Sequence, residues 1–238
     1  MKKNVLVVGA SGDIGIAISR RLAEEGYHLL LHFNRNRQPI DTLREELEGE
    51  SVLAVIQSDL SREEEIKRFL TELVFPVDHI VFASGMAHYG LFQEAPEQIM
   101  DEMLMLHVKA PWMITKHLLP RMIQDKAGNI VLVTSIWGEE GASNEVIYSS
   151  VKGAQNAFVK ALAKEAGPSG ILVNAVSPGF IETKMNQQIS REEREAIMEE
   201  IPLSRAGKPD EVAHVVSFLL EKKSSYIQGE IIKISGGW

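Results

Sequence analysis

Short, almost wholly apolar segments alternate with longer amphipathic ones along the chain, and this alternation predicts the secondary structure. A segment that is apolar at consecutive positions is typical of a strand buried on both faces, as in a parallel sheet. We therefore expect strands at residues 4–8, 27–33, 52–56, 79–83, 129–134, 171–176 and 230–234.

The intervening segments carry their hydrophobic residues at helical spacing. Gly26 and Gly167 stand where a helix end favours a left-handed residue. Strands alternating with helices predict an α/β fold with a doubly wound parallel sheet of about seven strands, of the Rossmann type. No linker or repeat divides the chain, so we expect a single domain over 1–238. The expected helices are 14–25, 39–48, 61–73, 96–124, 146–166 and 209–221.

One irregular region, 184–205, is rich in charge and follows a Pro-Gly turn. It has two interpretations. It is either an ordinary solvated helix or a lid over a substrate site, because excursions after the carboxyl end of a strand often serve ligands.

Composition narrows the function classes. The 25 basic and 33 acidic residues give a net charge of −8, which disfavours a nucleic-acid-binding surface. The chain has no cysteine, and its seven histidines are scattered, so we expect no protein-held metal. The start, MKKNVLVVGASGD, does not resemble a signal peptide, and no apolar run approaches the ~20 residues of a membrane span. A cytoplasmic protein without a membrane partner is the expectation.

The first expected strand runs into VGASGDIG, residues 8–15, and then into a helix. Glycines at such a junction permit a tight turn and let backbone N–H groups approach a pyrophosphate at the helix N-terminus. The usual GxGxxG spacing is absent. The position of the turn, after the first strand of an α/β chain, still indicates a dinucleotide.

The stretch YSSVK, residues 148–152, contains a second candidate for chemistry. Tyr148 and Lys152 are four residues apart, so they share one face of a helix. The pairing alone is common on exposed helices. Its chemical interpretation is that the ammonium lowers the pKa of the phenol and makes it a proton donor near neutral pH.

The turn and YSSVK together resemble the short-chain dehydrogenase/reductase family, with its TGxxxGxG and YxxxK motifs. Asp59 resembles the acidic residue after the third strand that binds adenine, and Ser135 lies where the family has its catalytic serine. Asn174 and Ser177-Pro178-Gly179 resemble the NxVxPG turn. The tail from IPLSRAGKPDEV to the end is similar to 3-oxoacyl-acyl-carrier-protein reductases, so the resemblance covers nearly the whole chain.

The resemblance implies an NADP(H)-dependent reduction of a ketone to a secondary alcohol within one NAD(P)-binding domain. Tyr148 would be the general acid, Lys152 would lower its pKa and grip the nicotinamide ribose, and Ser135 would hydrogen-bond the carbonyl oxygen. The implied cofactor-binding residues are Gly9, Ser11, Gly12, Asp13, Ile14, Gly15, Asn34, Arg35, Asp59, Leu60, Ala83, Ser84, Gly85, Tyr148, Lys152, Pro178, Gly179, Ile181 and Thr183.

Several residues depart from the family pattern. Val8 replaces a threonine of the turn, and Asp13 replaces a glycine. Because a carboxylate repels a pyrophosphate, we expect Asp13 to point away as a helix cap. The family's NNAG appears as Phe82-Ala83-Ser84-Gly85, and its helix asparagine appears as His107.

His107 is a candidate for the proton relay. In the family, the helix asparagine marks a distortion whose free backbone carbonyl holds a water linked to the lysine. Pro111 lacks the N–H that would bond the His107 carbonyl, so we expect this carbonyl to be free and the relay to survive through the backbone. The alternatives are that the imidazole itself shuttles protons, or that it is simply packed.

NADPH is expected over NADH. The segment from Tyr27 to Ile40 contains no acidic residue to hold ribose hydroxyls, whereas Asn34 and Arg35 follow the second expected strand and would suit a 2′-phosphate.

The overall resemblance favours 3-oxoacyl chains on acyl carrier protein as the substrate. The basic surface for that acidic carrier is thin, with Ser169 where an arginine is common and Lys126 nearby. SIWGE, His107 and the terminal GGW also resemble a branch that reduces the 5-aminopentanone group on a lysine of elongation factor P. Glu139 and Glu140 would suit an amine, although a solvated loop is an equal interpretation. A third hypothesis is a non-catalytic NADP(H)-binding sensor.

The family resemblance also implies a homotetramer paired through 96–124 and 146–166. Apolar side chains there could face a partner, although the same pattern would serve a core. The candidates are Met103, Leu106, Phe158 and Leu162.

Overall fold

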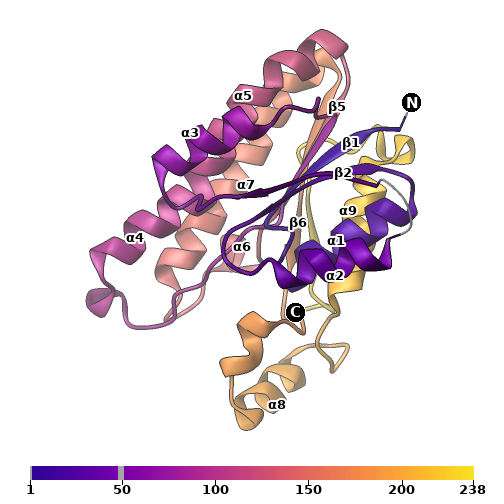
Figure 1. Ribbon diagram of the computed structural model, residues 1–238. Coiled ribbons are helices and arrows are strands. Elements are labelled where there is room, and N and C mark those ends of the chain that lie inside the picture. Colours follow the sequence, from indigo (N-terminus) through magenta and orange to yellow (C-terminus); the bar gives the residue numbers. More distant parts are fainter. Residues whose placement is uncertain (1, 48–50) are drawn as a thin grey trace.

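The computed structural model describes residues 2–47 and 51–238, which form three layers around one parallel sheet (Figure 1). The strand order is β3-β2-β1-β4-β5-β6-β7, and every pairing is parallel. The expected doubly wound sheet is therefore confirmed. The strands are β1 (Asn4–Val8), β2 (His28–Phe33), β3 (Val52–Gln57), β4 (His79–Phe82), β5 (Gly128–Val133), β6 (Ile171–Pro178) and β7 (Ile231–Ile234).

Helices cover both faces of the sheet, as the fully apolar strands require. One face carries α1 (Asp13–Glu24), α2 (Gln38–Glu46) and α9 (Pro209–Leu220), and the other carries α3 (Glu63–Glu72), α5 (Ala110–Asp125) and α7 (Val146–Ala166) (Figure 1). The remaining helices are α4 (Glu97–Leu104), α6 (Trp137–Glu140) and α8 (Arg191–Glu200), with 3₁₀ turns at Phe92–Glu94, Gly167–Ser169, Lys184–Gln188 and Lys222–Ser224.

The expected helix 96–124 is interrupted. It consists of α4, a π-helical segment at Met105–Lys109, and α5. Pro111, in the first turn of α5, has no N–H to continue the regular bonding pattern, and a single π turn accommodates the missing donor. Of the expected helix 39–48, residue 48 lies outside the described residues.

The region 184–205 forms a separate small lobe beside the sheet (Figure 1). Ser190 and Glu193 make a reciprocal capping box at the start of α8. The lobe has a small core of its own, in which Phe180, Ile201 and Ala206 pack against Ile197 and the terminal Trp238. In residues 2–47 and 51–238, no helix is long and apolar enough to cross a membrane.

Candidate active site

The expected site residues gather at one edge of the sheet because the carboxyl ends of parallel strands all meet there. The strand order reverses between β1 and β4, and such a switch point is where α/β sheets bind ligands. Gly9 follows β1 directly with φ +86, and a Cβ at this position would lie 2.4 Å from the backbone nitrogen of Ser84. Only glycine lets the two chain segments approach this closely.

The glycine-rich turn leads directly into α1, and no side chain caps this helix. Backbone N–H groups in its first turn are thus available to a pyrophosphate, so the turn fits a dinucleotide. Asp13 does not cap the helix as expected. Its Oδ2 instead accepts a hydrogen bond of 2.6 Å from the backbone N–H of Lys184, because the start of the 184–205 region lies beside the turn.

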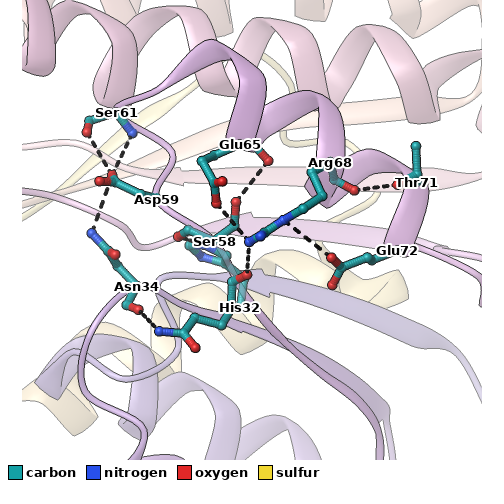
Figure 2. Close-up of polar contacts among 10 residues, drawn as sticks. His32, Asn34, Ser58, Asp59, Ser61, Glu65, Arg68, Thr71 and Glu72 are labelled. Atoms are coloured by element: carbon teal, nitrogen blue, oxygen red, sulfur yellow. Dashed lines mark hydrogen bonds and ion pairs between the residues drawn. The ribbon is translucent and has the colours of Figure 1, made fainter.

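His32 is the next-to-last residue of β2 and lies beside Ser58 of the loop after β3 (Figure 2). The backbone N–H of Gly9 donates to its Nδ1 at 3.1 Å, and its Nε2 lies 2.9 Å from the carbonyl oxygen of Ser58. The ring is almost wholly buried, and this desolvation lowers the pKa of His32 to about 4. The imidazole is therefore neutral at physiological pH.

The loop after β3 is ordered by Asp59, whose Oδ1 accepts from the N–H and the hydroxyl of Ser61 at 3.1 and 2.7 Å (Figure 2). Asn34 donates to the same oxygen at 3.4 Å. Arg35 is exposed, and within the described residues no carboxylate forms an ion pair with it. Its guanidinium is thus available to an anionic ligand.

Ser135, Tyr148 and Lys152 come together between β5 and α7. The backbone N–H of Trp137 donates to Ser135 Oγ at 3.3 Å, and the Ser135 hydroxyl is near enough to the Tyr148 phenol to lower its pKa. The Lys152 ammonium lies 5.4 Å from the centroid of the Tyr148 ring and donates to the carbonyl oxygen of Val133 at 3.0 Å. The three expected catalytic side chains thus form one cluster.

Burial dominates the ionisation of this cluster. It raises the pKa of Tyr148 to about 12, with a smaller opposing effect from the Ser135 hydrogen bond and a further rise from the charge of Glu145. Burial also lowers the pKa of Lys152 to about 7. The expectation that Lys152 lowers the phenol pKa is thus not met here, because desolvation disfavours both charged forms. The phenol is protonated at neutral pH, as a proton donor must be.

His107 lies in the π-helical segment and is fully buried, with its ring edge-on to Tyr148 at 6.0 Å between centroids. Its Nε2 lies 2.9 Å from the carbonyl oxygen of Met86. Burial, and then the charge of Lys152, lower its pKa to about 3. The His107 carbonyl is outside the regular helical bonding, as expected, but it accepts a hydrogen bond of 2.8 Å from Gln155 Nε2.

Trp137 and Trp238 connect the site to the lobe. Their rings pack edge-to-face with centroids 5.0 Å apart, and Trp238 Nε1 lies 3.3 Å from a carboxylate oxygen of Glu200 in α8. Thus the C-terminal residue contacts both the segment after Ser135 and the lobe.

Glu139 and Glu140 already have a cationic partner within the protein. Both form ion pairs with Lys233 on β7, at 3.3 and 2.7 Å. Glu145, by contrast, is half-buried at the start of α7, three residues before Tyr148, and burial raises its pKa. Within the described part of the chain no cation pairs with it.

The other expected cofactor residues lie along the same edge. Ile181 forms an isolated bridge with Gly207, next to the lobe. Sequence reasoning missed His32, Gln155 and Glu145. Of these, His32 had a signal in the sequence: it stands inside an apolar strand, and a buried polar ring needs hydrogen-bond partners. Among the other expected cofactor-binding residues, Ser11, Gly12, Ile14 and Gly15 form the turn and first turn of α1, Leu60 follows Asp59, Ala83 and Gly85 flank Ser84, Pro178 ends β6, and Gly179 and Thr183 follow it.

Comparisons with known proteins show similarity over nearly the whole chain. A family model described as Enoyl-(Acyl carrier protein) reductase matches residues 9–238. The uncharacterized oxidoreductase YmfI of Bacillus subtilis is 48% identical over 100% of this chain and 99% of its own length. The 3-oxoacyl-[acyl-carrier-protein] reductase FabG of Staphylococcus epidermidis is 32% identical over 100% of this chain and 99% of its own.

Solved structures give the same result. A putative NAD(P)-dependent gluconate 5-dehydrogenase from Beutenbergia cavernae, with bound NADP, matches with a TM-score of 0.93 and 27% identity, covering 99% of this chain and 96% of that one. YwfH, an NADPH-dependent reductase involved in bacilysin biosynthesis, matches with a TM-score of 0.91 and 25% identity, covering 100% and 98%. This chain belongs to the short-chain dehydrogenase/reductase family of oxidoreductases.

Proposed function

We propose that the protein reduces a ketone to a secondary alcohol with NADPH. The observation that carries this proposal is the cluster of Ser135, the protonated Tyr148 and the buried Lys152 at the edge of the sheet that fits a dinucleotide. The cofactor, when bound, supplies the hydride for the carbonyl carbon.

Residues of the chain donate the proton and stabilise the carbonyl oxygen of the substrate. Tyr148, with its pKa raised to about 12, holds a proton that it donates to the carbonyl oxygen as negative charge develops there. Ser135 Oγ accepts from the Trp137 N–H, so its own hydroxyl can donate to the same carbonyl oxygen once a substrate is bound and stabilise the charge that develops there. Lys152, with a pKa of about 7, can exchange a proton near neutral pH and so restore the phenol.

Arg35 supports NADPH as the preferred cofactor. It is exposed just after β2, where the ribose of a dinucleotide lies in this fold, and Asn34 stands beside it. The bound NADP of the Beutenbergia cavernae structure and the NADPH dependence of YwfH support the same choice.

The test is NADPH oxidation by the purified protein with a neutral 3-oxoacyl thioester. We expect turnover that Tyr148→Phe lowers by ~10²–10⁴-fold while NADPH binding persists. Binding of NADPH without turnover of any ketone would contradict the proposal and favour a non-catalytic sensor.

A 3-oxoacyl chain on acyl carrier protein is the first candidate substrate, supported by the FabG relatives at 31–36% identity. Glu145 favours a second candidate, a ketone with a primary amine such as the 5-aminopentanone group on elongation factor P. A half-buried carboxylate without a cationic partner, one helical turn before Tyr148, suits an ammonium group better than an acyl chain.

Glu145→Gln separates the two candidates. If the substrate carries an amine, this variant should lower kcat/KM for an amino ketone by about tenfold or more and leave a neutral ketone unchanged. Glu139→Gln is the matched control, because Glu139 already pairs with Lys233. Equal losses on both ketones would assign Glu145 to the tyrosine environment and remove this support for the amine.

We also propose that α8 and the rest of 184–205 close over the substrate. The Asp13–Lys184 and Trp238–Glu200 contacts tie both ends of this lobe to the site.

We propose that the protein assembles as the homotetramer of the family, but with different residues at the contact from those expected. Met103 and Leu162 are buried within the protomer, so the exposed Leu104 and Trp112 are the better candidates for contact with a partner.

A further inference from the structure

We propose that His32 is a positioning residue for the dinucleotide, which joins the glycine-rich turn to the loop after β3 through both nitrogens of one neutral imidazole. This inference rests on the proposed function, because it assumes that a dinucleotide binds at this edge of the sheet. Its pyrophosphate would lie on the turn and its adenosine half beside the β3 loop.

The two partners of the ring determine its tautomer. A neutral imidazole has one donor and one acceptor nitrogen. The Gly9 N–H can only donate, so Nδ1 must carry the lone pair, and the Ser58 carbonyl can only accept, so Nε2 must carry the proton. Reversing the tautomer would set two donors against each other and two acceptors against each other. The contact is therefore directional.

The surroundings hold the ring in place. Phe69 of α3 packs edge-on against it, with centroids 5.2 Å apart. The Ser58 hydroxyl donates to the backbone carbonyl of Glu65 at 2.9 Å, so the loop that accepts from His32 is itself bound to α3 (Figure 2). One connected set of hydrogen bonds thus runs from the turn, through β2, to the start of α3.

The main chain of β2 reinforces the same connection. The carbonyl oxygen of His32 accepts from the Ala10 N–H at 2.8 Å, and the Ser58 N–H donates to the Phe33 carbonyl at 3.0 Å. Gly9 has little freedom on its other side, where it lies against the backbone of Ser84. A change at Nδ1 therefore moves the Gly9 N–H, and with it the groups that would face a pyrophosphate.

A neutral, apolar side chain could fill this position in the core without needing partners, and a buried imidazole costs stability unless both nitrogens are bonded. The hydrogen bonds of His32 go to the two ligand-facing loops and not to another part of the core. This placement is what distinguishes positioning from packing.

Two matched variants separate the two bonds. In His32→Asn, the amide oxygen can occupy the place of Nδ1 and accept from Gly9, while the Ser58 bond is lost. In His32→Gln, the amide nitrogen can occupy the place of Nε2 and donate to Ser58, while the Gly9 bond is lost. The probes are NADPH and adenosine 2′-monophosphate, which has no pyrophosphate.

We expect His32→Gln to raise the Kd for NADPH by ~10-fold, which corresponds to the loss of one hydrogen bond in the bound state. The same variant should leave the Kd for adenosine 2′-monophosphate unchanged. His32→Asn should weaken both ligands by one and the same smaller factor, because only the adenosine side is disturbed. Calorimetric titration gives the Kd values. Equal shifts in both variants, or none, would overturn the inference even if both variants melt at the wild-type temperature.

The wild-type protein provides a test that needs no variant. Long-range ¹H–¹⁵N spectra at neutral pH should show His32 protonated at Nε2 alone. A proton at Nδ1, or on both nitrogens, would overturn the inference without affecting the proposed reductase. Wild-type protein that fails to bind NADPH would overturn both.

Discussion

Lys152→Met should stabilise the cofactor-free protein, and the stabilisation should grow as the pH falls. The Lys152 side chain is almost completely buried, and desolvation lowers its pKa from 10.5 to about 7. The unfolded chain therefore binds a proton over a pH range in which the folded chain does not. Methionine has a similar length and no charge to desolvate.

The size of the effect follows from linkage. Above pH 10.5 the amine is neutral in both states and has no cost. Between 10.5 and 7 the unfolded state is mostly protonated and the folded state mostly neutral, so the cost to folding grows as the pH falls, and it levels off about one pH unit below 7. At ~1.4 kcal/mol per pKa unit, the cost is about 2 kcal/mol at pH 9, about 4 at pH 7 and about 5 at pH 6.

Methionine also leaves the Val133 carbonyl without the donor that Lys152 supplies, which costs ~1–3 kcal/mol at every pH. The pH dependence is therefore a cleaner measure than the absolute stability. Urea unfolding of both proteins at pH 6, 7.5 and 9 should give a difference that grows by about 3 kcal/mol from pH 9 to pH 6. Lys160→Met, at an exposed position on the same helix, should show almost none of this dependence. A difference for Lys152→Met that stays flat with pH would refute the reasoning.

Three further predictions concern substitutions of single residues. Arg35→Glu should reduce the NADPH/NADH preference by about tenfold or more, because it places a carboxylate where the 2′-phosphate would lie; unchanged ratios of kcat/KM would contradict this. Trp112→Glu should shift the assembly to smaller species in light scattering, since it introduces a charge on the exposed apolar side of α5. Asp13→Ala should speed hydrogen exchange at the Lys184 amide, which donates to the Asp13 carboxylate; equal exchange rates would show that this bond does not hold the lobe.

The sheet and most helices were predictable because they depend on local patterns. Apolar strands such as VLAVI and NIVLV need no distant information to be recognised. The break at Met105–Lys109 was predicted only as a distortion. A π turn differs from an α turn by one residue of hydrogen bonding, and Pro111 shows that a donor is missing without showing how the backbone adapts.

The pairing of Tyr148 and Lys152 was predictable from their separation of one helical turn, whereas Ser135 was assigned only through the resemblance to the family. The ionisation states of these side chains were not predictable from the sequence. A sequence shows that an ammonium stands near a phenol, but the sign of the pKa shift depends on how much water reaches each group. Here burial is the largest cause, ahead of the Ser135 hydrogen bond and the charge of Glu145, so the pKa of Tyr148 rises.

The sequence left open whether the backbone carbonyl or the imidazole of His107 serves a proton relay. Side-chain hydrogen bonds from distant segments bear on this choice. Pro111 removes the helical donor from its carbonyl, as expected, yet Gln155 supplies a replacement 48 residues away, at 2.8 Å. A carbonyl oxygen has two lone pairs, so one of them remains for a water molecule after Gln155 has bound the other. The His107 imidazole is a weaker candidate for the relay, because a pKa of about 3 keeps it neutral and its Nε2 is already bonded to Met86. A backbone relay at this position therefore depends on Gln155, which positions the carbonyl, as much as on Pro111, which releases it.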